Sequence, residues 1–192
     1  TIIFITGCGK KDNQLVMVTE AGFAPYEYYE NGEIVGVDID IAKEIAKYLG
    51  KELVIKDVSF DSIINEVKSG KSDFGAAGIS YTDERAKEVD FTIDYSISKQ
   101  VIIAKEGINK VDNLDNKRIA LQLGSVADSY VTKNYKNAKV IRQKKYLAAI
   151  EDLKKCFKSR IKALAENKEE EKSDEFATNE FEEAFEENTK TA

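Results

Sequence analysis

The sequence predicts an α/β fold in which mainly parallel sheets are covered by helices on both faces. Stretches such as residues 14–19 and 52–57 have the apolar or alternating pattern of strands, and amphipathic stretches such as residues 61–69 follow strands along the chain. Helical stretches end at Gly50 and Gly70, and glycine is the usual residue just past a helix end. Repeated strand–helix units of this kind build parallel sheets.

Length and composition narrow the functional classes. The 192 residues suffice for one domain or two small lobes with a core. A formal charge of −6 argues against a nucleic-acid-binding protein. The sequence has no histidine and two cysteines, which excludes His-based catalysis and metal sites built on His or Cys, and its carboxylates lack the spacing of a calcium loop. We therefore expect neither a metal nor another cofactor.

Residues 76–91 form the stretch around which the chain is organised. A strand end runs into a loop of small residues, after which Thr82 has the chemistry of a helix N-cap. Arg85 then falls in the first helical turn, close to the backbone N–H groups of the Ser80 loop. A guanidinium beside free amides and a hydroxyl suits a carboxylate ligand. The alternative is a structural arginine paired with Asp83 or Asp90.

This stretch, Ala-Ala-Gly-Ile-Ser-Tyr-Thr-Asp-Glu-Arg at residues 76–85, resembles the signature of type II periplasmic substrate-binding proteins. The branch it resembles, solute-binding protein family 3, serves ABC transporters of polar amino acids. Further matches follow in the family's order at residues 23–28, 36–42, 60–64 and 124–125. The resemblance runs from about Gln14 to about Lys154. It implies a two-lobe periplasmic-binding-protein type II fold whose second lobe is incomplete.

The resemblance also implies a function and a site. A protein of this kind captures an amino acid by lobe closure, here about residues 95–99, and passes it to the membrane subunits of an ABC importer; it is monomeric and not an enzyme. Arg85 and Ser80 would hold the α-carboxylate, and Phe23 and Phe60 would enclose the side chain. The implied ligand-binding residues are Glu20, Phe23, Phe60, Gly78, Ser80, Arg85, Gln122 and Ser125, with no catalytic residue. Glu20 favours a polar or cationic ligand side chain, although Phe23 beside a proline is also typical of a core.

The sequence departs from the family pattern at residues 124–126, a second loop that could bind an anion. Gly124 and Ser125 open a predicted helix, where many relatives have a threonine next. This chain has Val126 instead, so Ser125 and backbone amides would have to bind the carboxylate.

The remaining elements follow from local pattern. Asn31-Gly32 predicts a tight hairpin turn, and Asp38 or Asp40 is expected to cap the next helix, which explains this pair better than catalysis does. Strands are expected at residues 100–105, 118–123 and 139–143, and a helix at 146–155. We expect a first lobe at residues 14–96 and a partial second lobe at 97–155.

The first thirteen residues resemble the end of a lipoprotein signal. Ile5-Thr6-Gly7-Cys8 matches a lipobox, and cleavage before Cys8 with acylation of its thiol would leave a polar tether to Asn13. The apolar run is too short to span a bilayer. The protein would then be anchored by lipid in the periplasm or at the outer face of the bacterial membrane. The alternative is a short buried strand with an inert cysteine.

The C-terminal part, residues 156–192, has no match in the resemblance. Residues 166–187 carry eleven acidic and two basic side chains, a local charge of −9. Phe176, Phe181 and Phe185 lie at helical spacing, which fits either an apolar stripe packed on the body or a solvated helix. Relatives place an aspartate that binds the ligand's ammonium group in this region. Its lack of a match leaves a non-binding remnant, and less readily an enzyme of the same fold, as alternative functions.

Overall fold

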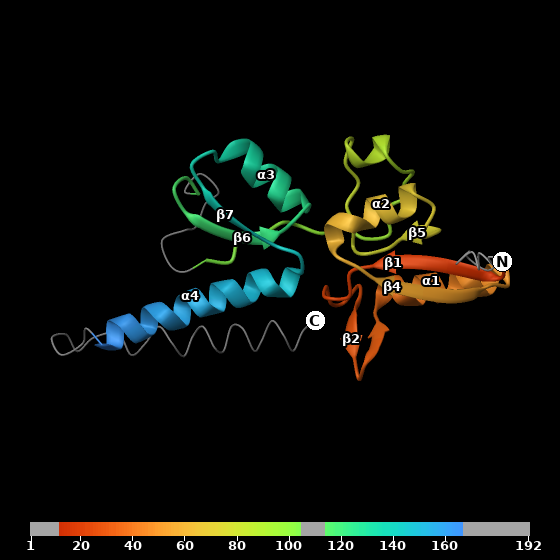
Figure 1. The fold of residues 1–192 in the computed structure, drawn as a ribbon, viewed down its shortest axis with the longest axis horizontal. Coiled ribbons are helices and arrows are strands. Elements are labelled where there is room, and N and C mark those ends of the chain that lie inside the picture. The colour runs from red at the N-terminus through yellow and green to blue at the C-terminus, as the bar shows by residue number, and fades with distance from the viewer. Residues whose placement is uncertain (1–11, 105–113, 167–192) are drawn as a thin grey trace, which may run out of the picture.

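The computed structural model describes residues 12–104 and 114–166, with side chains up to residue 159. Figure 1 shows two α/β units side by side, joined by an extended segment. We call residues 12–91 the first lobe, 92–104 the connecting segment and 114–166 the second lobe. The parallel sheets and their covering helices confirm the predicted α/β class.

The first lobe is built on a parallel sheet with strand order β4-β1-β5. Strand β1 (Gln14–Thr19) pairs along its whole length with β4 (Glu52–Asp57), and on its other side with the short β5 (Phe74–Gly75). Helix α1 (Val37–Leu49) covers one face, while the 3-10 turn η1 (Phe60–Ser62) and α2 (Ile63–Lys68) cover the other.

Alternation along β1 explains why this sheet has a core on each face. Met17 is fully buried against Ile39 and Ala42 of α1, whereas Val18 is buried against Ile63 of α2. Successive side chains of a strand point to opposite faces, so two adjacent apolar residues support both layers. The sheet edge that carries the ends of β1 and β4 is thereby fixed in place.

The hairpin of β2 (Tyr28–Glu30) and β3 (Glu33–Val35) confirms the predicted tight turn. Asn31 and Gly32 have φ values of 50° and 88°, the left-handed conformations that such a two-residue turn requires. The predicted capping of α1 by Asp38 or Asp40 is wrong. Gly36 occupies the N-cap, and both carboxylates lie in the first turn, where the helix dipole favours them.

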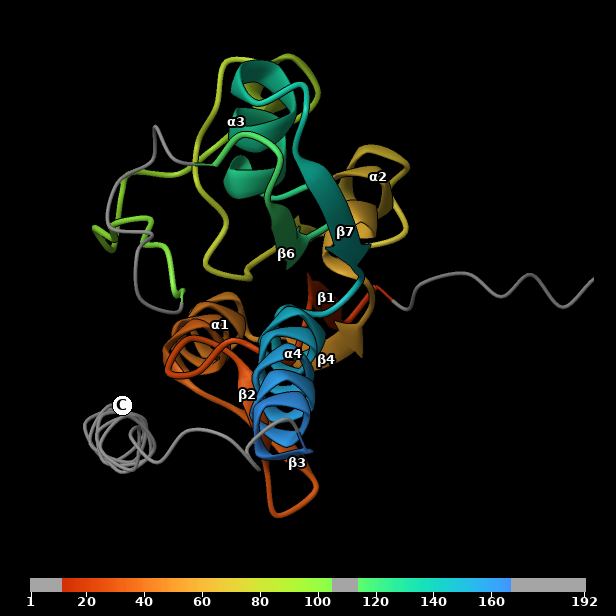
Figure 2. The same cartoon turned by 90° about the vertical axis from the view of Figure 1, so that its left-hand side faces the viewer.

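The second lobe contains a parallel pair, β6 (Arg118–Gln122) and β7 (Lys139–Gln143). Helix α3 (Val126–Asn134) and helix α4 (Tyr146–Glu166) cover opposite faces of this pair, as the views in Figures 1 and 2 agree. Helix α4 continues well beyond residue 155, its predicted end. The sequence there contains no glycine or proline that would stop a helix.

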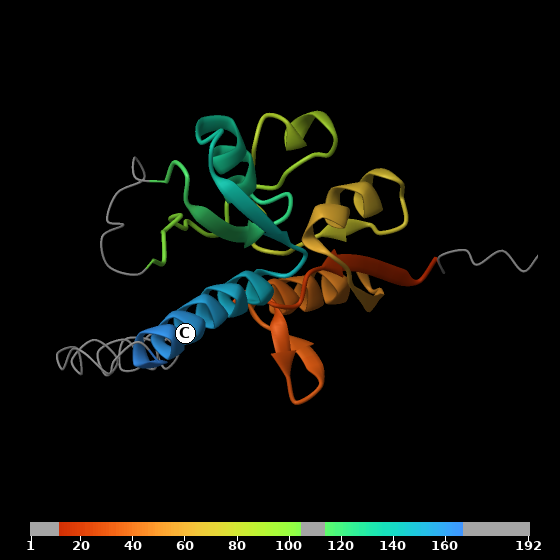
Figure 3. The ribbon, with the colours of Figure 1, turned by 60° about the vertical axis from the view of Figure 1, so that its left-hand side comes forward.

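The connecting segment is extended, but the predicted strand at 100–105 is not formed in its described part, residues 100–104. A strand needs a hydrogen-bonded neighbour, and no described strand pairs with this segment. Its alternating apolar side chains consequently stay exposed, with Ile93 at 89%, Ile97 at 94% and Val101 at 76%. Figure 3 shows the segment crossing between the lobes.

Two sequence predictions lie outside the described residues: the lipobox cysteine Cys8, and the phenylalanine stripe between residues 176 and 185. Within the described ranges, no helix is both long and apolar enough to cross a bilayer.

Candidate ligand-binding site

The carboxyl ends of the strands in the two lobes point toward each other. In Figure 1 the arrowheads of β1 and β6 face the junction between the lobes. A hydrogen bond crosses this junction from Gln122 Nε2, at the end of β6, to Glu20 Oε2, just after β1, at 3.0 Å. Ligands of open α/β sheets bind at this edge. The predicted ligand-binding residues lie at strand ends, in loops and, for Phe60 and Arg85, in the 3-10 turns η1 and η2 (Arg85–Lys87).

Arg85 contacts three of the elements predicted to surround the ligand. Its guanidinium donates from Nη1 to the Ser80 carbonyl at 2.6 Å and from Nη2 to the Gly124 carbonyl at 3.0 Å. Its Cζ lies 5.4 Å from the centre of the Phe60 ring. The Arg85 N–H donates to Thr82 Oγ1 at 3.1 Å, but the N-cap of the turn that contains Arg85 is Glu84, so the predicted N-cap role of Thr82 is wrong. The expected helix is a single 3-10 turn, η2 (Arg85–Lys87).

The charge of Arg85 has no acidic partner among the described residues. None of the ion pairs in this part of the chain includes Arg85, so the alternative pairing with Asp83 or Asp90 is not formed there. Burial lowers its pKa, and no neighbouring carboxylate opposes that shift. Two carbonyl oxygens and an aromatic face hold a guanidinium whose charge an anionic ligand group would neutralise.

Gly78 lets the loop after β5 lie against Phe23. Its φ is +51°, and a Cβ at this position would be only 2.9 Å from Phe23 Cε1. The Gly78 N–H donates to Asp38 Oδ2 at 2.8 Å, so this amide already has an acceptor. Phe23 stacks on Tyr26 and meets Tyr146 of α4 edge to face, with centroid distances of 5.4 and 5.3 Å. The ring of Phe23 therefore joins the two lobes.

An acidic group lies at the other end of the junction. Glu20 is 1% exposed, and Lys145 Nζ lies 3.5 Å from its Oε1 and 3.1 Å from Asp57 Oδ2. Glu20 Oε1 lies within ion-pair distance of that ammonium but has no hydrogen-bond partner among the described residues. Burial raises the pKa of Glu20 despite the opposing effects of Lys145 and Gln122.

Asp57 and Lys145 were not predicted from the sequence. Asp57 is the last residue of β4, and its Oδ1 accepts from the Ala21 N–H at 2.9 Å. Its position at the carboxyl end of a predicted parallel strand was a usable signal. Lys145 directly precedes α4, and nothing local in the sequence distinguishes it from its neighbour Lys144.

A second pair of buried carboxyl groups lies beneath the Gly78 loop. Glu27 and Asp38 are each 1% exposed. Burial, together with the nearby charge of Asp38, raises the pKa of Glu27 to about 10. Glu27 is thus neutral near pH 7. Asp38 thus lies buried near Glu27 and accepts from the Gly78 N–H, whereas Asp40 is exposed on α1.

The start of α3 is already occupied by a side chain of the same helix. Ser125 Oγ accepts from the Asp128 N–H at 3.2 Å, and the Gly124 N–H donates to Asp128 Oδ2 at 3.1 Å. Arg142 Nε holds both oxygens of Asp128, at 2.9 and 3.1 Å. Ser125 thus acts as an N-cap, and the amide of Gly124 is engaged. The predicted second anion site therefore meets Arg85 through the Gly124 carbonyl, which accepts a hydrogen bond from the guanidinium.

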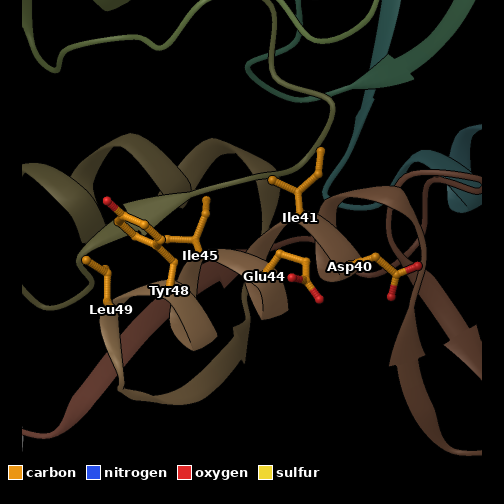
Figure 4. A pocket seen from close by; sticks show the side chains of 6 residues that line it. All are labelled: Asp40, Ile41, Glu44, Ile45, Tyr48 and Leu49. Carbon is orange, nitrogen blue, oxygen red and sulfur yellow. The ribbon is translucent and has the colours of Figure 1, made fainter.

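A hollow of about 590 Å³ lies elsewhere, on the outer side of α1 (Figure 4). Its lining consists of Asp40, Ile41, Glu44, Ile45, Tyr48 and Leu49. None of the predicted ligand-binding residues belongs to this lining. The described ranges contain no group of three or more acidic, Cys or His side chains placed to hold a metal ion.

Comparison with known proteins relates this arrangement to a family. The sequence profile of "Bacterial extracellular solute-binding proteins, family 3" matches residues 15–190. The chain is 35% identical over 133 residues to the arginine-binding extracellular protein ArtP of Bacillus subtilis, covering 65% of the chain and 52% of ArtP. It is also 35% identical over 136 residues to the ABC transporter arginine-binding protein 1 of Escherichia coli, covering 70% and 56% respectively.

Solved structures agree with this relationship. An ancestral arginine-binding protein bound to glutamine matches with a TM-score of 0.71 and 38% identity, covering 77% of this chain and 68% of that one. An ancestral arginine-binding protein bound to arginine matches with a TM-score of 0.68 and 36% identity, covering 76% and 67%.

The chain spans about half the length of the curated relatives it matches, and the structure accordingly covers part of their two-lobe fold. The profile match continues past Lys155, where the motif resemblance ends. The parallel sheets, the motif order and these similarities agree. The chain belongs to the bacterial extracellular solute-binding proteins of family 3.

Proposed function

We propose that this chain binds an amino acid between its two lobes and delivers it, as a monomer, to the membrane subunits of an ABC importer. The observation that carries the proposal is the half-buried guanidinium of Arg85, held by carbonyls of both lobes without an acidic partner among the described residues. A ligand carboxylate supplies the missing negative charge. Relatives named as amino-acid-binding proteins support this role.

The acidic end of the junction, formed by Glu20, Asp57 and Lys145, suggests the class of the ligand side chain. With both carboxylates ionised, Glu20, Asp57 and Lys145 together carry one excess negative charge, and no described residue donates a hydrogen bond to Glu20 Oε1. A cationic or hydrogen-bond-donating side chain meets both conditions. Several relatives are named for arginine, so arginine is our first candidate and glutamine the second.

Titration calorimetry with the twenty amino acids tests the proposal. We expect heat of binding for arginine and weaker heat for glutamine, and none for arginine amide, which lacks the carboxylate. Equal affinity for arginine and arginine amide would remove Arg85 from the site.

A second candidate function, a remnant that binds no amino acid, rests on the ammonium-binding aspartate that has no match beyond Lys155. Because losing a buried charge partner costs about 3 kcal/mol or more, we expect binding roughly a hundredfold weaker than in a relative that has this aspartate. Heat for none of the twenty amino acids would favour the remnant. Turnover of an amino acid by the purified chain would instead favour an enzyme.

We also propose that Cys8 carries a lipid anchor, on the basis of the lipobox Ile5-Thr6-Gly7-Cys8. Expressed with a complete signal sequence, the protein is expected to partition into detergent, and Cys8→Ser is expected to move it to the aqueous phase. Aqueous partitioning of both forms would contradict the anchor.

A further inference from the structure

One lysine links the two lobes at the acidic end of the site. Lys145 lies in the second lobe, directly before α4, whereas Glu20 and Asp57 follow β1 and end β4 in the first lobe. Lys145 Nζ lies between the two carboxylates, 3.5 Å from Glu20 Oε1 and 3.1 Å from Asp57 Oδ2. Burial alone would lower the pKa of Lys145, but Asp57 and Glu20 together raise it, so its ammonium stays charged.

The two carboxylates are held more firmly than the lysine. Asp57 accepts from the Ala21 N–H at 2.9 Å and from the Tyr29 hydroxyl at 3.2 Å. Glu20 accepts from Gln122 and is almost completely buried. The side chain of Lys145 is 46% exposed, and its long flexible stem leaves its ammonium as the movable member of the group.

We propose that Lys145 determines which ligand side chain the site prefers. Its ammonium competes with a cationic ligand side chain for the two carboxylates, and it balances their negative charge when the ligand side chain is neutral. This inference rests on the proposed amino-acid-binding function. The ammonium of Lys145 occupies the position beside Glu20 and Asp57 that suits the guanidinium of arginine.

The two ligand classes respond to this lysine in opposite directions. A guanidinium entering the acidic end meets a like charge, and it must share the two carboxylates or displace the ammonium. A neutral amide, as in glutamine, brings no charge and therefore depends on Lys145 to balance Glu20 and Asp57. Removing the ammonium should strengthen arginine binding and weaken glutamine binding. The quantity to measure is therefore the ratio of the two affinities.

The test compares Lys145→Met with Lys144→Met, measuring arginine and glutamine binding to the full chain by calorimetry. Lys144 is the matched control because it is the adjacent residue, and its exposed side chain makes no ion pair with a described residue. In Lys145→Met the preference for arginine over glutamine should rise at least about tenfold, which corresponds to about 1.4 kcal/mol. In Lys144→Met it should stay at the value of the unmodified chain.

Two further variants keep the test decisive. Lys145→Arg retains a cation and is expected to keep the preference close to that of the unmodified chain, while Lys145→Gln repeats the charge removal if Lys145→Met does not fold. An unchanged preference in the folded neutral variant overturns the role of Lys145 while leaving the proposed function intact. Binding of neither amino acid by the unmodified chain overturns the proposed function, and this inference with it.

Discussion

The two ends of the interlobe site bury charge in different ways. At the basic end, Arg85 is held by the carbonyls of Ser80 and Gly124, which are neutral dipoles. At the acidic end, Glu20 and Asp57 have Lys145 as their own counter-ion. Dipoles orient a charge without neutralising it, whereas a counter-ion also satisfies it. In the function we propose, the basic end attracts a ligand group and the acidic end discriminates between ligand groups.

The comparison also shows that neither end belongs to one lobe. The first lobe supplies Arg85, Glu20 and Asp57, while the second supplies the Gly124 carbonyl and Lys145. Both sets of contacts need the lobes at their present separation, and a change in that separation would affect both ends together.

The largest effect is expected from breaking the basic end. Arg85→Lys keeps the charge but cannot donate to Ser80, Gly124 and a ligand carboxylate with the same fork. Loss of a charged hydrogen bond costs about 1.5–3 kcal/mol, so the dissociation constant for arginine should rise roughly ten- to hundredfold in calorimetry.

Arg118→Lys, on the exposed start of β6, is the control for this substitution and should change that constant by no more than about twofold. Equal effects of the two variants would mean that Arg85 does not face the ligand.

A smaller effect is expected from the loop that supports the basic end. Gly78→Ala imposes a methyl group at φ +51° and 2.9 Å from the Phe23 ring. Conformational strain and the close contact together should lower the free energy of unfolding by about 2 kcal/mol.

Gly50→Ala separates these two causes because Gly50 has a similar φ of +63° with nothing within 4 Å of the added Cβ. It should cost about 1 kcal/mol, measured by urea unfolding. If the free energy of unfolding fell equally in the two variants, the contact with Phe23 would not contribute to the loss.

The last prediction concerns Glu27, a buried carboxyl group beside Asp38 with no ion pair to a described cation. Its pKa lies at about 10 in the folded chain against an ordinary 4.5, so the folded state holds the proton more tightly. Its contribution to stability is fully present below pH 4.5 and is lost as the pH rises through about 10. One linked proton gives a slope of at most about 1.4 kcal/mol per pH unit.

Glu27→Gln should flatten this pH dependence and stabilise the chain at pH 8 in urea unfolding, whereas Glu30→Gln, at the exposed end of β2, should do neither. A slope that survives in Glu27→Gln would assign the linked proton to another group.

The local sequence pattern predicted those strands and turns whose formation depends on residues adjacent in the chain. The bounds of β1, β4 and β7 follow from their apolar or alternating residues, and the hairpin follows from Asn31-Gly32. The resemblance identified the strand ends and loops around the junction.

Contacts between distant residues were beyond sequence reasoning. Lys145 meets Asp57 across 88 positions, and Glu27 meets Asp38 only because the hairpin folds back on α1. The strand expected at residues 100–105 failed for the same reason, since pairing depends on a neighbour that the pattern of one segment does not specify.

Cys156 gives this molecule a convenient attachment point. It is a free, exposed thiol on α4, eleven residues after Lys145, and the sequence contains one other cysteine, Cys8. In Cys8→Ser, a maleimide dye would therefore label a single position on the second lobe. Its emission would report rearrangement of the lobes as arginine is added, without a second engineered site. The same thiol calls for a reducing buffer, because two exposed copies can cross-link.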